Sequence, residues 1–461
     1  MTPDANELCI FAVKRGNIEG RLDVRNLKYK NNHRDQKTTT ATLGSLTIEE
    51  PCYGTSATAI ERTDDSQPKY IRITDFDDFG IEGGHEFKAA EDYSEKHILK
   101  AGDILFARTG GTVGKTYYYD GSIGKAVFAG YCIRFRFDEK KVLPRFIYWY
   151  TKTSIYQRWV NGIQRPSGQP NINKEEYKSF RIILPDLKRQ EKLCDDINNA
   201  ETRRKRKLQQ ADELICSICH YIHSVLKMDE VSNDKPIMFI TKRRNFVGSR
   251  FDPEYHNPFF SRRIAEISKT TFDVLDNVIE FSFETWNQKD YFVEDFPYIE
   301  ISNVSIKGNQ YTVSYVRVLD APSRAKMIVR NGDIIVSTTR PHRGAIATIQ
   351  CPENDILVAS TGFCVLRDLK RSDVLKEYLQ WILLDDYVLL QMLQRSSGGN
   401  YPAINAEELK KIVIPIPNIK IQRMICEEAQ NRKAKADTLR KEAEREWLEA
   451  KAQFERELLG E

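Results

Sequence analysis

The sequence contains two copies of one unit, and this internal repeat limits the possible folds more than any other feature. The segment Phe11–Asn17 (FAVKRGN) recurs about 230 residues later as Phe239–Asn245 (FITKRRN). Further matches follow in the same order at nearly the same spacing: Arg21–Asp23 with Arg250–Asp252, Tyr70–Ile73 with Tyr298–Ile301, Gly102–Ile104 with Gly332–Ile334, Gly130–Cys132 with Gly362–Cys364, Trp149 with Trp381, and Ile172–Lys178 with Ile404–Lys410. Collinear matches indicate a tandem duplication, and two copies this long predict a pseudo-twofold molecule rather than a stacked solenoid.

Each copy begins with a globular part of mixed α and β structure. In the first copy, aromatic and β-branched residues alternate with turn signals such as Gly83-Gly84 and Asp120-Gly121, which indicates short strands. Tyr131–Phe137 alternates with period two and predicts a strand with one apolar face, whereas the aromatic spacing of Leu143–Val160 predicts a helix. We therefore expect an α+β fold in each copy.

Each copy ends in a long amphipathic helix. After Pro185, apolar residues from Leu193 to Val225 recur at heptad-like intervals among many charges, and the same change of character follows Pro415 and Pro417. A helix of about 40 residues is about 60 Å long, and its narrow apolar stripe requires a partner helix. We expect the two helices to pair as an antiparallel coiled coil that holds the globular domains apart. The predicted domains are residues 1–184 and 229–414, each followed by its helix, 185–228 and 415–461.

Composition is typical of a globular protein. Hydrophobic residues make up 41% of the 461 residues and charged residues 30%, and no apolar stretch is long enough to cross a bilayer. The first 19 residues lack the features of a secretory signal and the nine cysteines are dispersed, so we expect a cytoplasmic protein with reduced thiols. The net charge of +4 does not by itself indicate a nucleic-acid partner, so any basic surface must be local.

Several strings, together with this domain order, resemble the specificity subunit of Type I restriction-modification systems over nearly the whole chain. They are Gly102–Lys115 (GDILFARTGGTVGK), Ile182–Leu187 (IILPDL) followed by Gln190, Arg250–Tyr255 (RFDPEY), and Ser397-Gly398 with Pro402–Ile404. The copies differ where Val336–Gly344 (VSTTRPHRG) replaces the glycine-rich turn, and where copy one lacks the Tyr-containing continuation of its Arg21–Asp23. These differences predict that the two globular domains read different bases.

The resemblance implies a non-catalytic protein with two target recognition domains and two spacer helices. Each domain would read one half of a bipartite target in double-stranded DNA. The helices would bind two methyltransferase subunits and, through them, the restriction endonuclease subunits. They would also set the number of unread base pairs between the halves, and half-sites one helical turn apart lie roughly 34 to 36 Å from centre to centre. We expect no cofactor, no metal and no membrane partner.

The candidate DNA-contacting residues lie in two turns of each copy. Glycines allow close backbone approach, while arginine and lysine side chains bind phosphates or guanine. The candidates in copy one are Arg108, Thr109, Gly110, Gly111, Lys115, Arg165, Ser167 and Gln169, and those in copy two are Thr338, Arg340, His342, Arg343, Ser397, Asn400 and Tyr401. Tyr53, Ser56 and Thr58 are further candidates. The alternative is a set of tight structural hairpins with solvated charges.

Four other patterns favour structural explanations. Gly110–Thr116 superficially resembles a phosphate-binding loop, but its glycines enclose three residues where that loop has four. Cys216–His220 (CSICH) with His223 resembles haem or zinc ligands, but it lies inside the predicted helix. Arg203–Lys207 (RRKRK) fits a solvated helix face, with DNA or an acidic partner as the alternative. Asn257–Phe260 (NPFF) lacks the second proline of the amino-methyltransferase motif, and we find no cofactor loop to accompany it.

The leading hypothesis is therefore a DNA-reading adaptor within a methyltransferase and endonuclease complex. The alternatives are an enzyme that modifies or cleaves DNA with its own active site, and a protein-interaction scaffold. Methyl transfer or cleavage by the isolated chain would favour the enzyme. Failure to bind any DNA duplex at low salt would favour the scaffold.

Overall fold

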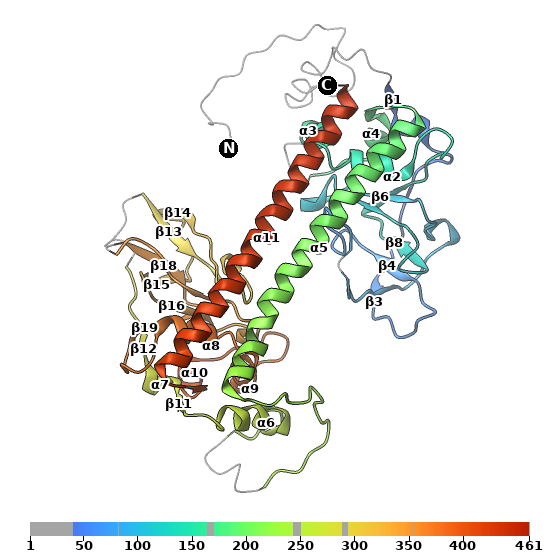
Figure 1. Ribbon diagram of the computed structural model, residues 1–461. Coiled ribbons are helices and arrows are strands. Elements are labelled where there is room, and N and C mark those ends of the chain that lie inside the picture. Colours follow the sequence, from blue (N-terminus) through green and yellow to red (C-terminus); the bar gives the residue numbers. More distant parts are fainter. Residues whose placement is uncertain are drawn as a thin grey trace. The chain divides into compact units, whose positions relative to one another are not determined.

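The computed structural model describes residues 40–81, 83–163, 170–242, 250–287, 294–353 and 355–460 (Figure 1). The chain divides into two compact units: unit 1 holds the residues up to Lys205 and from Ala443 onward, and unit 2 holds Arg206–Glu442. Each unit thus contains one globular part together with one end of each long helix. The predicted division at residues 184, 228 and 414 stays a prediction, and the repeat matches at Phe11–Asn17 and Arg21–Asp23 lie outside the described residues.

Unit 1 is built mainly from short strands followed by three helices. Its elements are β1 Thr40–Thr42, η2 Leu43–Leu46, β2 Cys52–Tyr53, β3 Ala59–Ile60, β4 Lys69–Ile71, β5 Ala89–Ala90, η3 Glu95–His97, β6 Ile104–Ala107, η4 Gly110–Thr112, β7 Thr116–Tyr118, β8 Ala126–Phe128, β9 Cys132–Phe135, α2 Pro144–Tyr150, α3 Ser154–Ile163, α4 Lys174–Ser179, β10 Arg181–Ile183 and the start of α5 Leu187–Leu226. The largest sheet has the strand order β2-β9-β6-β7, β4 pairs with β8 in parallel, and β1 pairs with β10.

The central strand β6 is buried on both faces. Ile104 and Phe106 belong to one apolar cluster, and Leu105 and Ala107 belong to another. A continuous apolar run is what a strand covered on both sides requires. The end of β6 is therefore held firmly, and the turn that follows it projects from a rigid base.

Unit 2 contains the corresponding elements in the same order, preceded by η6 and α6. They are η6 Glu254–His256, α6 Pro258–Ile267, β11 Phe272–Val274, α7 Leu275–Val278, β12 Ile279–Ser282, β13 Asp295–Ile299, η7 Ile301–Asn303, β14 Ser314–Arg317, η8 Val318–Asp320, β15 Ala325–Arg330, β16 Ile334–Ser337, η9 Pro341–Arg343, β17 Ile346–Thr348, β18 Ile356–Ser360, β19 Phe363–Leu369, α8 Lys376–Ile382, α9 Asp386–Arg395, α10 Ala406–Lys410, β20 Val413–Pro415 and the start of α11 Ile419–Leu459.

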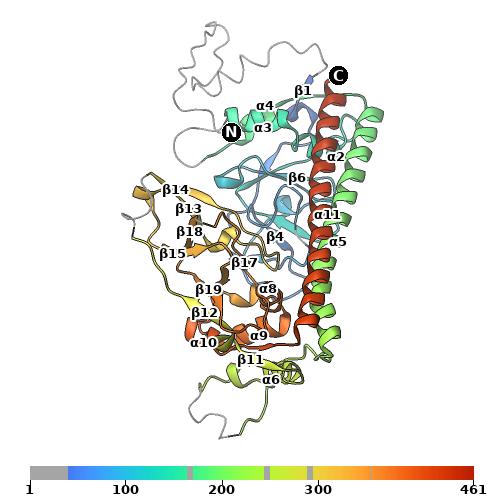
Figure 2. The same cartoon turned by 60° about the vertical axis from the view of Figure 1, so that its left-hand side comes forward.

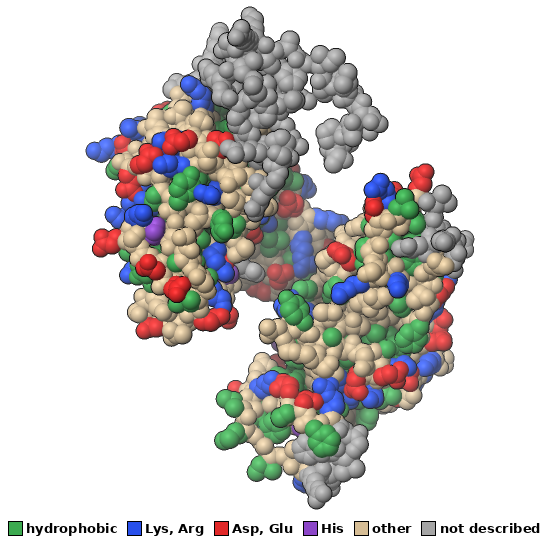
Figure 3. Space-filling model, turned by 180° about the vertical axis from the view of Figure 1, so that it is seen from behind, with side chains coloured by type: hydrophobic (Ala, Val, Ile, Leu, Met, Phe, Trp, Pro, Cys, Tyr) green, Lys and Arg blue, Asp and Glu red, His purple; other side chains and the backbone are tan. Residues whose placement is uncertain are grey.

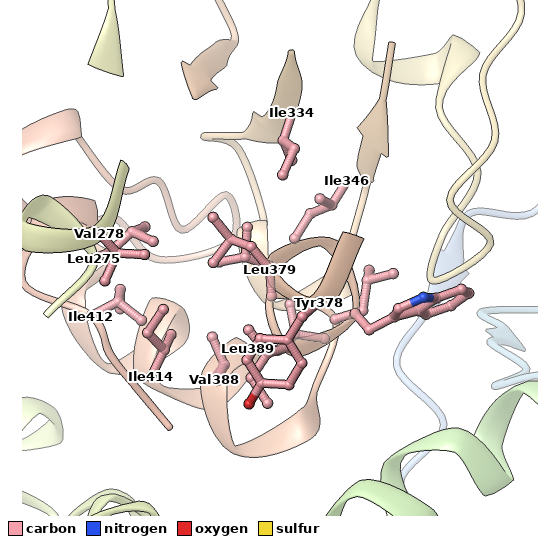
Figure 4. Close-up of a cluster of buried hydrophobic side chains, with 14 of the residues drawn as sticks. Leu275, Val278, Ile334, Ile346, Tyr378, Leu379, Val388, Leu389, Ile412 and Ile414 are labelled. Carbon is pink, nitrogen blue, oxygen red and sulfur yellow. The ribbon is translucent and has the colours of Figure 1, made fainter. Parts of the chain in front are cut away.

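Three strand pairings of unit 1 recur in unit 2: the order β12-β19-β16-β17 matches β2-β9-β6-β7, β13 pairs with β18 in parallel, and β11 pairs with β20. The second sheets differ, because β13 and β18 lie in a four-stranded sheet of order β14-β13-β18-β15, whereas β4 and β8 form a two-stranded one. In Figure 4, side chains from β16, β17, α8, α9 and β20 converge on one apolar cluster that includes Ile334, Leu379 and Ile414. The predicted α+β class, with a long helix after each globular part, is confirmed.

One of two local predictions in unit 1 is confirmed and the other needs correction. The strand predicted over Tyr131–Phe137 forms as β9, with Ile133 and Phe135 in one apolar cluster, while Arg134 on the other face is only 5% exposed and is paired with Glu49. The helix predicted over Leu143–Val160 is divided into α2 and α3. The hydroxyls of Thr151 and Thr153 donate to the carbonyls of Tyr148 and Tyr150, both at 2.7 Å, and this local bonding competes with continuation of the helix.

The long helices pair antiparallel within unit 1. Near the start of α5, Leu193 and Ile197 share an apolar cluster with Trp447 and Phe454 near the end of α11. Lys192 contacts Glu457 at 3.4 Å, whereas Arg204, three turns later in α5, lies 4.0 Å from Glu444. The pairing therefore runs in opposite directions, and the helix pair is part of the core of the globular part.

Unit 2 contains the other ends of the same two helices, again side by side (Figures 1 and 2). Ile218 and Ile222 of α5 share a cluster with Ile425 of α11. Lys207 pairs with Glu442 at 2.7 Å and Asp212 pairs with Arg440 at 2.8 Å, which is again the antiparallel sense. The predicted antiparallel coiled coil is thus observed in each unit.

Charged side chains of both signs are interspersed with apolar ones on the faces seen in Figure 3. This mixture agrees with the small net charge of +4. In the part of the chain that the structure describes, no helix is long and apolar enough to cross a membrane.

Candidate nucleic-acid interface

The first candidate turn of unit 1 follows the buried strand β6 and includes Arg108, Thr109, Gly110, Gly111 and Lys115. The Arg108 amide donates to the Tyr131 carbonyl and the Ala107 amide to the Lys115 carbonyl, both at 2.9 Å. Gly110 adopts a φ of 71°, which favours glycine because it lacks a Cβ. Gly111 is exposed, Arg108 and Lys115 are half-buried, and Thr109 is buried.

This turn is joined to the segment that ends the second candidate loop. The Gly110 amide donates to the Pro170 carbonyl at 3.0 Å, and the Ile172 amide donates to the Arg108 carbonyl at 2.9 Å. The turn is therefore bonded to Pro170 and Ile172, which directly follow the second candidate loop predicted from sequence. The loop's own candidates, Arg165, Ser167 and Gln169, lie outside the described residues.

Arg108 places its guanidinium over an aromatic ring that belongs to strand β2. Its guanidinium lies 4.9 Å from the ring centroid of Tyr53 in β2, and its Nε is buried without a hydrogen-bond partner. The Tyr53 hydroxyl accepts a hydrogen bond from the Lys174 amide at 3.2 Å. Tyr53, a weaker candidate from sequence, is therefore adjacent to Arg108, while Ser56 and Thr58 are exposed in the segment after β2.

Gly114 explains part of the glycine-rich string in structural terms. Its φ is 87°, and a Cβ there would lie 2.7 Å from Cγ1 of Val160 on α3. The Tyr156 hydroxyl donates to the Gly114 carbonyl at 2.9 Å. Gly114 therefore lets the turn pack against α3, which accounts for its presence without a phosphate ligand.

The corresponding turn of unit 2 is held by equivalent backbone bonds. The Thr338 amide donates to the Gly362 carbonyl at 2.8 Å, and the Ile404 amide donates to the Thr338 carbonyl at 2.9 Å. Thr338 therefore occupies the backbone position of Arg108, and its hydroxyl also donates to the Gly362 carbonyl at 2.9 Å. The arginine of this turn comes two residues later, at Arg340, with a φ of 48°.

Arg340 is in contact with the second candidate loop of its unit. Its amide donates to the Pro402 carbonyl at 2.7 Å, and its Nη2 donates to the Asn400 carbonyl at 3.0 Å. The guanidinium lies 4.3 Å from the ring centroid of Tyr401, which is 70% exposed. Ser397 bonds to Ala403 through both backbone groups at 2.8 Å. Four of the residues predicted for unit 2 therefore lie close together: Arg340, Ser397, Asn400 and Tyr401.

His342 and Arg343 complete this turn. Arg343 is exposed, and His342 is half-buried with its Nδ1 unbonded. Burial lowers the pKa of His342, and the neighbouring charges of Arg343 and Arg340 lower it further. This lowering favours the neutral imidazole, which offers a donor and an acceptor rather than a positive charge.

A segment that sequence reasoning did not assign to the site fixes the loop of unit 2. Arg250 donates from Nη1 to the Arg395 carbonyl at 2.7 Å and from Nη2 to the Ser396 carbonyl at 2.9 Å. Gln394 donates to the Tyr255 carbonyl at 2.7 Å. We call Arg250–Tyr255 the brace. The sequence of the brace resembles the specificity-subunit family, and this resemblance was the available sign that the segment matters. The sequence alone did not reveal that the brace contacts a loop about 145 residues away.

A buried ion-pair network lies at the other end of the central strand in both units. Asp103 is 0% exposed and accepts from Nε and Nη2 of Arg136 at 2.7 and 2.8 Å. Asp333 is 1% exposed and accepts from Nη2 of Arg367 at 3.0 Å. The Asp103 hydrogen bonds raise the pKa of Arg136. The two candidate turns therefore project from scaffolds of the same construction.

Three of the remaining patterns have structural partners. Arg204 of the basic run lies 3.7 Å from the Phe79 ring centroid, and Lys207 pairs with Glu442, so this run is only partly a solvated face. Cys216–His223 lies within α5, and His223 contacts Asp385 at 2.8 Å. The Asn257 side chain accepts from the Phe259 amide at 3.0 Å and caps α6.

A known protein family matches both halves of the chain. The family is described as the Type I restriction modification DNA specificity domain, and the matches cover residues 53–209 and 272–441. Each match contains one candidate turn, its loop and part of the helix that follows.

Individual proteins are also similar. The MjaVIII specificity subunit of Methanocaldococcus jannaschii is 21% identical over 354 residues, which is 75% of this chain and 76% of that subunit. The HindI specificity subunit of Haemophilus influenzae is 27% identical over 178 residues, 38% of this chain and 33% of that subunit. Among solved structures, a chain of a type I R-M system (TM-score 0.47, 14% identity) covers 93% of this chain and 97% of its own. The S subunit of M. genitalium (TM-score 0.43, 13% identity) covers 92% and 97%.

Proposed function

The chain belongs to the Type I restriction modification DNA specificity domain family, and from this premise we propose that its two units read the two halves of a bipartite DNA target. The chain is a DNA-recognition subunit of a restriction-modification system, and its role is specificity rather than catalysis. The observation that carries the proposal is that the family match occurs twice, once over each globular part.

The proposed reading surfaces are the turn after β6 in unit 1 and the turn after β16 with the Ser397–Tyr401 loop in unit 2. Each turn presents an arginine at the end of a buried strand, beside backbone that a ligand can approach closely. Arginine can bind both phosphates and the edges of guanine bases. The loop residues Arg165, Ser167 and Gln169 complete this set in unit 1.

The partners of the chain are DNA together with methyltransferase and restriction subunits. We propose that two methyltransferase subunits bind along α5 and α11, and that the endonuclease subunits join through them. Each helix has about 40 residues and continues from one unit into the other. On this proposal the length of the two helices sets the number of unread base pairs between the half-sites. We also propose the cytoplasmic location that the sequence predicts.

Mapping methylated sites across the host genome, with and without this gene, tests the function directly. We expect one bipartite motif to lose methylation when the gene is removed and to regain it on complementation. Loss of a single undivided motif, or no change, would contradict the proposal. Methyl transfer by the isolated chain would point to the enzyme alternative.

A further inference from the structure

We propose that Arg108 and Arg340 each read a guanine base, and that Tyr53 and Tyr401 are positioning residues that hold these guanidinium groups in a fixed plane. This inference rests on the proposed function and names the chemical group that each unit recognises. The base-reading atoms would be N7 and O6 of guanine, which match the paired donors of a guanidinium in the major groove.

The first observation is that each guanidinium lies over a tyrosine ring. The guanidinium of Arg108 lies 4.9 Å from the Tyr53 ring centroid, and that of Arg340 lies 4.3 Å from the Tyr401 ring centroid. Stacking on an aromatic face restricts the rotation of a guanidinium while leaving its edge free for hydrogen bonds. A guanidinium held in this way suits a bidentate contact with the N7 and O6 atoms of guanine.

The second observation is that neither arginine is neutralised. Within the described residues, Arg108 and Arg340 make no ion pair, whereas the scaffold arginines Arg136 and Arg367 are bonded to buried carboxylates. Arg108 Nε is also buried without a hydrogen-bond partner. Both guanidinium groups therefore keep a positive charge that no carboxylate among the described residues neutralises.

The third observation concerns Tyr53 and Tyr401, which come from unrelated places in the two copies. Tyr53 belongs to β2, and Gly54 after it packs so closely that a Cβ would lie 2.3 Å from the Phe128 carbonyl oxygen. Tyr401 belongs to the loop after α9, and Arg340 lies two residues beyond the backbone position of Arg108. Each unit has therefore assembled an arginine–tyrosine pair from different residues, which favours a shared chemical task with a different register on DNA.

The test uses the full chain assembled with its methyltransferase subunits and duplexes that carry the mapped target. Each guanine is replaced in turn by 7-deazaguanine, which lacks the N7 acceptor. For the wild-type chain we expect one replacement in each half-site to weaken binding about 10-fold or more. Arg108→Ala should weaken binding to the target similarly and abolish the effect of 7-deazaguanine in one half only. Arg340→Ala should do the same in the other half.

Controls separate base reading from charge and folding. Arg108→Lys and Arg340→Lys keep the positive charge, so the salt dependence of binding should not change in these two variants. Arg145→Lys is the matched control and should leave binding unchanged. The Arg145 guanidinium, on α2, also lies over a tyrosine ring, 5.9 Å from the Tyr118 centroid, but it lines a cavity together with Asn198 of α5. Tyr401→Phe should keep the 7-deazaguanine effect, whereas Tyr401→Leu should reduce it.

The outcomes distinguish this inference from the proposed function. A complex that prefers the target to a scrambled duplex but tolerates every 7-deazaguanine would overturn the inference and leave the function standing, as would a mapped half-site without guanine. Equal binding of the target and the scrambled duplex would overturn the proposed function itself. A reduced salt dependence in Arg108→Ala and Arg340→Ala, with guanine sensitivity intact, would identify both residues as phosphate contacts.

Discussion

The candidate surfaces of the two units share a scaffold and differ in the residues that complete it. In both units a buried aspartate precedes the central strand, and the next turn is held by the same two backbone bonds. In the turn itself, the backbone position of Arg108 in unit 1 is occupied by Thr338 in unit 2. The arginine of the unit 2 turn is Arg340, two residues later. Burial constrains the scaffold, while the exposed turn is free to change, and this division suits a protein whose two halves read different sequences.

The largest effect should come from breaking the shared scaffold. Asp103→Asn removes the buried one of the two carboxylates that Arg136 contacts, the other being Glu49, and we expect the free energy of unfolding to fall by about 3 kcal/mol. Asp333→Asn should cost about as much in unit 2. Urea unfolding of the full chain would measure both, with Asp65→Asn, a fully exposed site, as the control. Very unequal losses would show that the two scaffolds are not equivalent.

The next largest effect should be a loss of DNA binding that is confined to the half-site of unit 2. Arg250→Ala removes two charged hydrogen bonds that hold the start of the Ser397–Tyr401 loop. We expect about 30-fold weaker binding, corresponding to about 2 kcal/mol, and only for duplexes in which the half-site of unit 2 is intact. Competition with duplexes altered in one half at a time measures this. An equal loss of discrimination at both half-sites would contradict the role of the brace.

The glycines that follow the two turns should differ by a smaller amount. An alanine Cβ at Gly114 would lie 2.7 Å from Val160, whereas at Gly344 the nearest atom is 3.1 Å away, on the flexible side chain of Lys307. Both have a positive φ, so both substitutions carry backbone strain. We expect Gly114→Ala to cost about 1 kcal/mol more than Gly344→Ala in thermal or urea unfolding. The reverse order would contradict the packing of this turn on α3.

The smallest effect should appear in the pH dependence of unit 1. Lys152 is 7% exposed, and burial lowers its pKa from 10.5 to about 8, while Leu384 holds the matching place in unit 2. Because the folded pKa lies below the unfolded one, the cost of charging Lys152 is fully present below pH 8 and declines as pH rises toward 10.5. Lys152→Leu should stabilise the chain by about 1 kcal/mol at pH 7 and abolish this dependence. Unfolding measured from pH 7 to 10 checks both, and an unchanged pH profile would rule out a buried charge.

The sequence repeat predicted the twin α+β architecture, the two long helices and the positions of the turns, because these follow from local periodicity and collinear matches. The partners of each turn were beyond prediction, because Tyr53 meets Arg108 and Arg250 meets Arg395 only after the chain folds. The break at Thr151–Thr153 was missed since aromatic spacing continues across it. The sequence also did not show that each long helix contributes to both units. Trp447 and Phe454, near the end of α11, pack on the globular part of unit 1, which lies far away in the sequence.

The central claim is that each unit reads its own half of the target. Exchanging residues 11–184 for those of another family member, while keeping Phe146 and Trp149 for their contacts with α11, tests this most directly when followed by genome-wide methylation mapping. The account predicts a new motif in which one half has changed and the other half and the spacing are retained. A motif in which both halves change, or neither does, would contradict it.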